Sequence, residues 1–320
     1  MLENTAFEEL TALLGPVFTT QEAVTAGLAK SELARAAQRQ HLVRLRRGVY
    51  TSAAAWQEQA PQGRHILQVM ADQRVRPEAV ACAFSAAVLL DLPTPLNRPP
   101  ARVYSTLPRT TLNRGETGPG EGALVRRAWL SKQDVLTLAN GIRVTSAPRT
   151  VWDCGRHWPR PWALAIADAA LARGHCDLPV LQRRIAEQIA APGAQNVRWA
   201  VRHADPRAES PLESLARARL MMAGLPPVQP QVRIRTRRGI YRVDLFDEAN
   251  QIVIEADGRI KYLAGEDLWK EKRREDALRE VGLRVVRFTM QDHHNPTPFL
   301  ATYRSLLPLQ PPSQLQLHQR

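Results

Sequence analysis

Apolar residues recur at helical spacing along the first forty positions, and the pattern then changes to short alternating runs. The helical spacing predicts three helices, over 3–14, 20–27 and 32–40. Residues 42–50 are expected to form two short strands around a turn at Arg47 and Gly48. The opening part of the chain is therefore predicted to be three helices followed by a basic hairpin.

That order of elements is typical of a winged helix-turn-helix, which we place at residues 1–55. Residues 56–205 are expected to form a second α/β module. Its helical patterns lie at 65–75, 79–90, 161–173 and 178–190, and its strand patterns at 103–107, 123–129 and 141–144. Proline, glycine and charged residues gather between 191 and 207, which indicates a boundary there.

Residues 206–308 are predicted to form a third module, which opens with a helix over 211–223 capped by Ser210. Three strands, a charged helix, a fourth strand and a last helix are then expected at 231–235, 241–246, 252–257, 266–281, 283–289 and 298–306. This order describes an α/β sandwich around a small mixed sheet. The tail, 309–320, is predicted to be flexible, and the fold class of the whole chain to be α/β (α+β).

The net charge of the chain indicates which class of partner it binds. Lys and Arg number 44 against 31 Asp and Glu, a net charge of +13, while hydrophobic residues make up 44% of the chain. A folded basic protein of this kind favours a polyanionic partner, and nucleic acid leads. The acidic amino terminus, the absence of a long apolar run and the three cysteines predict a cytoplasmic protein without a membrane segment.

Three acids are placed to meet in the last module. The period of two puts Glu255 and Asp257 on one side of their strand, and a hairpin turn brings Asp244 alongside. Close carboxylates repel unless a cation lies between them, so the pattern predicts a site for Mg²⁺ or Mn²⁺. Such an ion activates water and stabilises a phosphodiester transition state. The alternative is a strand end with solvated acids.

Cations follow these acids on the charged helix. Lys270, Arg273 and Arg274 are suited to phosphate contacts beside a phosphodiester-cleaving centre. The alternative is a solvated helix face with charge pairs one turn apart. The histidines and cysteines at Cys154, His157, His175 and Cys176 match no zinc-ligand spacing, and ordinary packing is expected for them.

The predicted reading helix and the hairpin carry the candidate DNA contacts. On the helix these are Lys30, Arg35, Gln38 and Arg39, and on the hairpin Arg44, Arg46 and Arg47. Arginine and glutamine on a helix in the major groove contact base edges, while wing arginines hold phosphates. The alternative is a winged helix that binds a protein.

The last module resembles the very-short-patch-repair-like endonuclease domains of uncharacterised bacterial proteins. The resemblance rests on Glu-Ser-Pro-Leu-Glu-Ser at 209–214, Tyr-Arg-Val-Asp-Leu at 241–245, Ile-Glu-Ala-Asp-Gly at 254–258, Trp-Lys-Glu-Lys-Arg-Arg-Glu at 269–275 and Gly-Leu-Arg-Val-Val-Arg-Phe at 282–288. It implies a PD-(D/E)XK restriction-endonuclease-like fold over about a third of the chain.

By that resemblance, Asp244 and Glu255 are the metal-binding acids of the first and second motifs, and Glu213 is an additional acid. Asp257 stands where many relatives have lysine, and Lys261 stands where many have histidine. Lys261 is expected to stabilise the phosphate or orient the water, because an ammonium group cannot act as a neutral imidazole base at neutral pH.

Most of residues 15–180 resembles the AbiEi-type antitoxins, which are transcriptional autoregulators of type IV toxin-antitoxin systems. The residues that carry this resemblance are Phe-Thr-Thr-Gln-Glu-Ala at 18–23, Leu-Arg-Arg-Gly-Val-Tyr at 45–50, Ala-Phe-Ser-Ala-Ala-Val-Leu-Leu at 83–90 and Val-Thr-Ser-Ala-Pro-Arg-Thr-Val-Trp-Asp at 144–153. The resemblance implies a nucleotidyltransferase toxin encoded nearby as partner.

Two functions follow from these patterns. The first is a bacterial DNA-binding protein with a metal-dependent endonuclease domain that cleaves DNA. The second is a non-catalytic transcriptional autorepressor or antitoxin whose last domain only grips DNA or a toxin. The retained acids favour the first function, and the replaced lysine and histidine favour the second.

Overall fold

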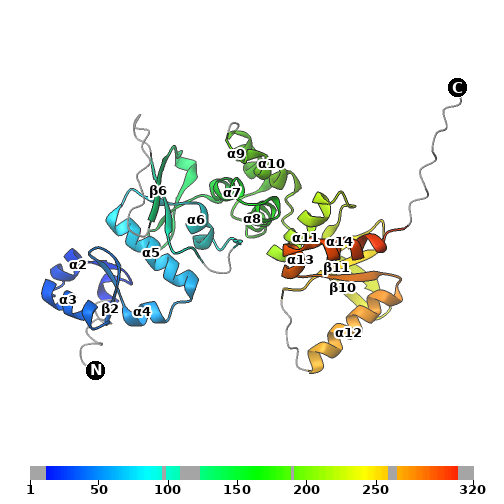
Figure 1. The fold of residues 1–320 in the computed structure, drawn as a ribbon, viewed down its shortest axis with the longest axis horizontal. Helices are drawn as coiled ribbons and strands as arrows, with labels where there is room; N and C mark the ends of the chain where they lie inside the picture. The colour runs from blue at the N-terminus through cyan, green and yellow to red at the C-terminus, as the bar shows by residue number, and fades with distance from the viewer. Residues whose placement is uncertain (1–11, 96–98, 109–122, 189–190, 259–264, 309–320) are drawn as a thin grey trace. The chain divides into compact units, whose positions relative to one another are not determined.

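The computed structural model describes residues 12–95, 99–108, 123–188, 191–258 and 265–308. The chain divides into two compact units, one made of 1–158 with 175–198 and the other of 159–174 with 199–320. Each unit is described by itself (Figure 1). Both contain helices and a mixed sheet, which confirms the predicted α/β fold class.

The first unit begins with a small antiparallel sheet and two helices. Its elements are β1 (Phe18–Thr19), α2 (Thr20–Thr25), α3 (Lys30–Gln38), β2 (Leu42–Arg46) and β3 (Val49–Ser52), with strand order β1-β3-β2. Phe18, Leu33 and Leu42 meet in the core between helices and sheet. The two helices and the hairpin predicted here are confirmed, while most of the helix predicted over 3–14 lies outside the described residues.

Helix α5 (Pro61–Val75), which follows the short α4 (Ala53–Gln57), packs on this small sheet. Leu67 and Ala71 of α5 lie against Val17 and Val49 in one buried cluster. The same helix also contacts α6 (Ala83–Leu89) and, in the second sheet, β5 (Val103–Pro108). Residues 1–55 and the part of 56–205 that belongs to the first unit are therefore joined by shared packing, and the domain boundary between them stays a prediction.

The second sheet is mixed and has the order β6-β5-β4-β8-β7. Its elements and covering helices are β4 (Val80–Ala81), α6 (Ala83–Leu89), β5 (Val103–Pro108), β6 (Ala123–Ala128), η1 (Lys132–Asp134), β7 (Val135–Thr137), β8 (Arg143–Thr145), α7 (Ala147–Gly155) and α9 (Leu178–Ala186). The helix predicted over 79–90 was wrong at its start, because Val80 and Ala81 pair with β5 instead. A short strand buried on both faces shows the same apolar run as a buried helix.

The boundary expected within 191–207 stays a prediction, and the middle of this segment is helical. Helix α10 (Ala194–His203) occupies it, and Val197 and Ala200 are fully buried. Helix α8 (Arg160–Ala172) belongs to the second unit, where Leu164 packs against Ala218 of α11 (Pro211–Met222). The third predicted module is therefore accompanied in its unit by a helix from earlier in the chain.

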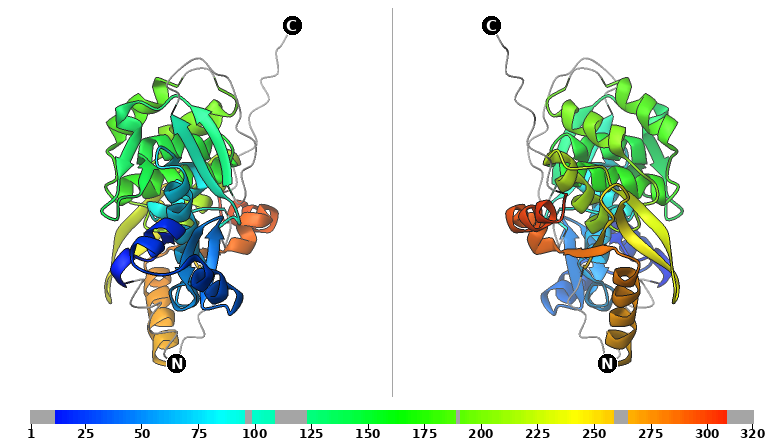
Figure 2. Two further views of the ribbon diagram at one scale, coloured as in Figure 1. Left: turned by 90° about the vertical axis from the view of Figure 1, so that its left-hand side faces the viewer. Right: turned by 90° about the vertical axis from the view of Figure 1, so that its right-hand side faces the viewer.

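The second unit is built on a four-stranded sheet with the order β12-β11-β10-β9. After α11 it comprises β9 (Gln229–Thr236), β10 (Gly239–Asp247), β11 (Ile252–Ala256), α12 (Gly265–Glu280), β12 (Arg284–Phe288), α13 (Met290–His294) and α14 (Pro296–Ser305). Strands β11 and β12 run parallel and the other pairs antiparallel, so the predicted mixed sheet is confirmed. Figure 2 shows β9 and β10 as a pair of long yellow strands.

A helix needs about 20 predominantly apolar residues to cross a bilayer. Among the described parts of the chain, no helix is long and apolar enough to do so.

Candidate functional site

The turn between β2 and β3 is fixed to the start of α2. Gly48 occupies the left-handed region with φ of +71°, and its carbonyl oxygen accepts a hydrogen bond of 2.8 Å from the Thr20 backbone N–H. At the same helix start, the Thr19 hydroxyl accepts from Glu22 N–H at 3.1 Å while the Glu22 carboxylate accepts from Thr19 N–H at 2.7 Å. These contacts hold the hairpin turn in a set position relative to the helix pair.

Helix α3 turns its predicted DNA-contacting side chains to solvent. Leu33 and Ala36 are buried in the core beneath the helix. The candidate contacts are all exposed, namely Lys30, Arg35, Gln38 and Arg39. The helix therefore has one apolar face for the core and one polar face that a ligand can reach.

The three hairpin arginines differ in exposure. Arg44 and Arg47 are exposed, and Arg46 is half-buried. Arg46 donates through Nη1 to the Leu45 carbonyl at 3.1 Å, and its own carbonyl accepts from Arg44 Nε at 3.3 Å. Arg44 and Arg47 are thus the hairpin cations most open to a partner.

In the second unit, the pairing of β10 with β11 ends just before two acids. The last paired residues are Leu245 and Ile254. Beyond them, the Asp244 carboxylate accepts from the Ala256 backbone N–H at 2.9 Å. A side chain thus replaces the backbone ladder, and Asp244 and Glu255 lie in the gap where the strands diverge.

Arg274 of α12 reaches into the same gap. Its Nη2 donates to Glu255 Oε1 at 2.9 Å and to the Arg242 carbonyl at 2.6 Å. Burial raises the pKa of Glu255 to about 7, with the Arg274 charge opposing and the Asp244 carboxylate adding to the rise. The Asp244 carboxylate is therefore close enough to influence the ionisation of Glu255.

Glu213 of α11 lies beside this pair. It is buried, and it accepts from Gln231 Nε2 at 2.9 Å and from Glu209 N–H at 3.1 Å. Burial raises its pKa, these hydrogen bonds oppose the rise, and the charge of Asp244 adds to it. Three of the predicted acids thus lie near one another, because the charge of Asp244 acts on both Glu213 and Glu255.

Asp257 is held differently. Its backbone N–H donates to the Phe288 carbonyl at 2.9 Å, and its carboxylate lies 4.0 Å from Arg287 Nη1. Within the residues that the structure describes, no group of three or more His, Cys, Asp or Glu side chains is placed to hold a metal ion. Lys261 lies outside the described residues.

The donor set can be tested against the predicted ion. Mg²⁺ keeps several waters and is commonly bound through only one or two carboxylates. Asp244 and Glu255 supply two carboxylates, and Arg274 already donates to one oxygen of Glu255. Those two residues fit a hard cation as partial ligands, and an ion shared by all four predicted acids stays a prediction.

The predicted cations of α12 lie in different settings. Arg274 is committed to Glu255, and Arg273 is exposed. The side chain of Lys270 lies outside the described residues. Of the three, Arg273 is the described side chain that is open to a phosphate.

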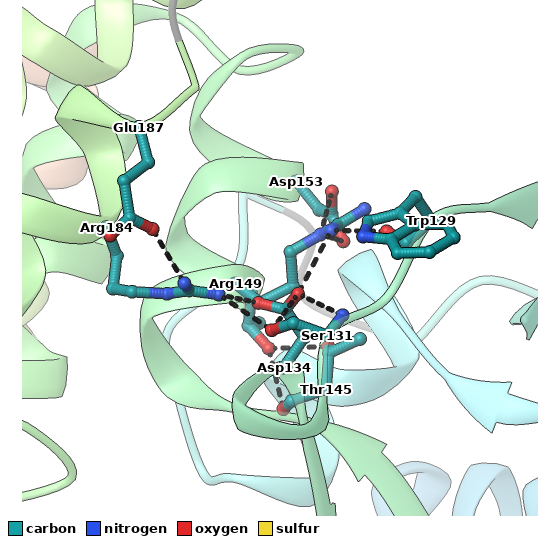
Figure 3. Close-up of polar contacts among 9 residues, drawn as sticks. Trp129, Ser131, Asp134, Thr145, Arg149, Asp153, Arg184 and Glu187 are labelled. Carbon is teal, nitrogen blue, oxygen red and sulfur yellow. Dashed lines mark hydrogen bonds and ion pairs between the residues drawn. The ribbon is translucent and has the colours of Figure 1, made fainter.

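A polar cluster in the first unit was missed by the sequence analysis (Figure 3). Arg149 Nε lies 3.1 Å from both carboxylate oxygens of Asp153, and its Nη1 donates to the Trp129 carbonyl at 3.1 Å. Asp134 forms an ion pair with Arg184 and accepts from Ser131 N–H at 2.8 Å. Arg149 and Asp153 are one helical turn apart in the motif at 144–153, but the other partners of Arg149, Trp129 and Asp134, lie too far along the chain for spacing to reveal them.

The carboxylates of this cluster are paired with arginines. Burial is the largest influence on the pKa of Asp134 and favours its neutral form, but hydrogen bonds from Ser131 and Arg184 outweigh it and lower that pKa. Burial raises the pKa of Asp153, and Arg149 opposes the rise. Two arginines and two aspartates tie η1, α7 and α9 together, which is a structural role.

Comparison with known families gives a match at the amino terminus. Residues 8–53 match a family described as "Transcriptional regulator, AbiEi antitoxin". The matched segment includes α2, α3 and both strands of the hairpin. The amino-terminal region is thus similar to AbiEi antitoxins, as its motifs predicted.

Relatives occur in Mycobacterium tuberculosis. Two uncharacterised proteins, MT2308 and Rv2248, from two strains, are 33% identical over 153 residues, which cover 47% of this chain and 56% of each relative. The chain thus spans little more than half the length of these relatives. Among solved structures, the RV2827C protein of the same organism is similar at 16% identity with a TM-score of 0.42, over 71% of this chain and 82% of that one.

Proposed function

We propose that the protein is a DNA-binding transcriptional regulator that reads duplex DNA with α3 and holds its backbone with the β2–β3 hairpin. The observation that carries this proposal is the joint exposure of cations on both elements, which the Thr20–Gly48 hydrogen bond keeps in register. A helix seated in the major groove with a basic wing on the phosphates needs this arrangement.

The similarity of 8–53 to AbiEi antitoxins supports a regulator of the antitoxin class. On this proposal the protein represses its own promoter in the cytoplasm. By the same resemblance, its protein partner is a nucleotidyltransferase toxin encoded nearby.

The test is a binding assay of the full chain on duplexes from its own promoter and on unrelated duplexes. Arg44→Ala with Arg47→Ala should weaken binding to every sequence. The dependence of log Kd on log salt should fall by about 0.9 for each phosphate that the variant no longer neutralises. Arg35→Ala or Gln38→Ala should change sequence preference, by roughly 1 to 3 kcal/mol per base contact.

A double variant with Lys132→Ala and Arg183→Ala is the matched control, because both side chains are exposed cations of the same unit away from the hairpin. The control should bind as the wild type does. If the hairpin variant and the control bind alike, the regulator proposal is wrong.

A second candidate function is metal-dependent cleavage of DNA by the second unit. The observation that favours it is the placement of Asp244 and Glu255 in the gap between β10 and β11, next to the buried Glu213. In that function Asp244 and Glu255 would hold Mg²⁺ or Mn²⁺, which supplies an activated water and charge stabilisation when bound. Arg273 would contact a phosphate.

The test pairs two readouts, calorimetric Mn²⁺ binding and cleavage of plasmid and single-stranded DNA. Asp244→Asn and Glu255→Gln should each remove both signals while DNA affinity is kept or slightly raised, because a negative charge is removed near the phosphates. Asp276→Asn is the control, since this exposed acid lies on α12 and outside the gap. A wild-type protein that binds DNA but neither binds Mn²⁺ nor cleaves would exclude this function.

A further inference from the structure

The β9–β10 hairpin has two faces of opposite character. On one face Val232, Ile234 and Tyr241 pack with Val243 against Leu278 of α12. Residues directly opposite each other in an antiparallel pair share a face, and the other face holds Arg233 opposite Arg242 and Arg235 opposite Ile240. One side of the hairpin therefore belongs to the core, and the other is basic.

The basic face is open to solvent. Arg233, Arg235 and, in the two-residue turn, Arg237 are exposed. Ile240, which lies opposite Arg235 on β10, is 59% exposed. Side chains two residues apart on a strand are separated by about 6.8 Å. Arg233 and Arg235 on β9 and Arg237 in the turn that follows it form a row of exposed cations, here called the arginine row.

The arginine row is not neutralised within the described parts of the chain. The neighbouring Arg242 is paired with Glu209 at 2.7 Å, and Arg238 is paired with Glu280. No acid of the described residues forms an ion pair with Arg233, Arg235 or Arg237. Two positive charges on β9 and a third in the turn that follows it are therefore exposed to solvent.

The charged side chains of β9 and of the first part of β10 are all positive. Strand β9 is the edge strand of its sheet, and edge strands are protected from pairing with other chains by charge of either sign. Residues 229–242 contain five arginines and no acid. Protection of an edge strand can use positive and negative side chains together, whereas binding of a polyanionic ligand requires positive side chains.

We propose that the arginine row is a second DNA-binding surface, which places the β9–β10 hairpin against the phosphate backbone of duplex DNA. The major groove of B-DNA admits a two-stranded β-ribbon. Ile240, exposed on the same face, is then covered by the duplex. This inference deepens the proposed regulator function, because it gives the second unit a role in DNA binding that does not depend on cleavage.

The experiment measures binding of the full chain to a 30-base-pair duplex, a length of about three helical turns, over a range of salt. The triple variant Arg233→Gln, Arg235→Gln, Arg237→Gln should lower the salt dependence of log Kd by about 2 to 3 and weaken binding on the order of tenfold. The control triple variant Arg202→Gln, Arg279→Gln, Arg304→Gln removes the same charge from exposed arginines of the same unit. It should change the salt dependence by less than about 1.

Equal effects of the two triple variants on DNA binding would overturn the proposal. Unchanged DNA binding in the arginine-row variant would also overturn it, even if that variant lost binding to an acidic protein. Comparison with the Arg44→Ala, Arg47→Ala variant separates this failure from failure of the regulator function. If only the β2–β3 hairpin variant loses affinity, the arginine row is wrong and the regulator stands. If only the arginine-row variant loses affinity, the α3 and hairpin reading is wrong and the arginine row stands.

Discussion

Arg274 Nη2 donates to Glu255 Oε1 over 2.9 Å and thereby places a positive charge beside a carboxylate whose neighbour is Asp244. Burial and the Asp244 charge raise the pKa of Glu255 to about 7, although the Arg274 charge opposes this rise. The ionisation of Glu255 is thus decided by the balance between one cation and one anion in a poorly hydrated gap.

We expect Arg274→Met to raise the pKa of Glu255 further, because the opposing charge is removed while burial and Asp244 remain. The measurement is an NMR pH titration of the glutamate side-chain carboxyl carbons, with Glu255→Gln identifying the resonance. Asp244→Asn should shift the midpoint in the opposite direction. A wild-type midpoint near the ordinary glutamate value would contradict this account of the gap.

Gly48 is expected to be needed for the position of the β2–β3 turn. An L-residue in its left-handed conformation costs roughly 1 to 2 kcal/mol, and a Cβ there would lie 3.4 Å from Thr20 Oγ1. Gly48→Ala should therefore lower the thermal midpoint of the protein. Gly48→Asn should lower it less, since asparagine tolerates this conformation better. Equal midpoints for the two variants would mean that backbone strain is not the cause.

Arg217 and Asp168 form a buried ion pair between α11 and α8, with Arg217 Nη1 2.9 Å from Asp168 Oδ2. Arg217→Met leaves a buried carboxylate without its cation, and we expect it to lower the free energy of unfolding by about 3 to 5 kcal/mol. The double variant Arg217→Met, Asp168→Leu should regain much of that stability. Denaturant unfolding of the two variants measures the difference, and a double variant no more stable than the single one would refute it.

His65 should make the protein less stable in acid. Burial, and to a lesser extent the Arg46 charge, lower its pKa from 6.5 to about 4, while its backbone contact with Pro100 opposes the shift. Between those two values the unfolded chain binds the proton more readily than the folded chain. The stability that neutral His65 contributes is therefore complete above about pH 6.5 and is lost as pH falls towards 4, at most about 3 kcal/mol.

The measurement is the free energy of unfolding of the wild type and of His65→Gln from pH 7 to pH 4.5. The variant should show the shallower dependence on pH, since its side chain does not titrate. His293, whose pKa is also lowered to about 4 by burial, titrates in both proteins and cancels in the comparison. Equal slopes would exclude His65 as the cause.

Local patterns alone predicted much of the secondary structure. The helix caps are contacts within one helical turn, between Thr19 and Glu22 and between Ser210 and Glu213. The residues that start a helix therefore stand next to it in the chain. The alternation of Val232 and Ile234 with Arg233 and Arg235 likewise records which side of a strand is buried. Such features need no knowledge of the rest of the molecule.

The tertiary structure decided the features that depend on distant partners. Val80 and Ala81 became a strand because β5 and β8 lie on either side of them, and α10 became a helix because Val197 and Ala200 have a core to enter. The sequence placed Asp244, Glu255 and Glu213 as candidate acids, but not the end of the β10–β11 pairing or the entry of Arg274 into the gap. Periodicity records whether a side chain is buried, whereas the identity of its partner is set by the packing of elements that the chain brings together only when it folds.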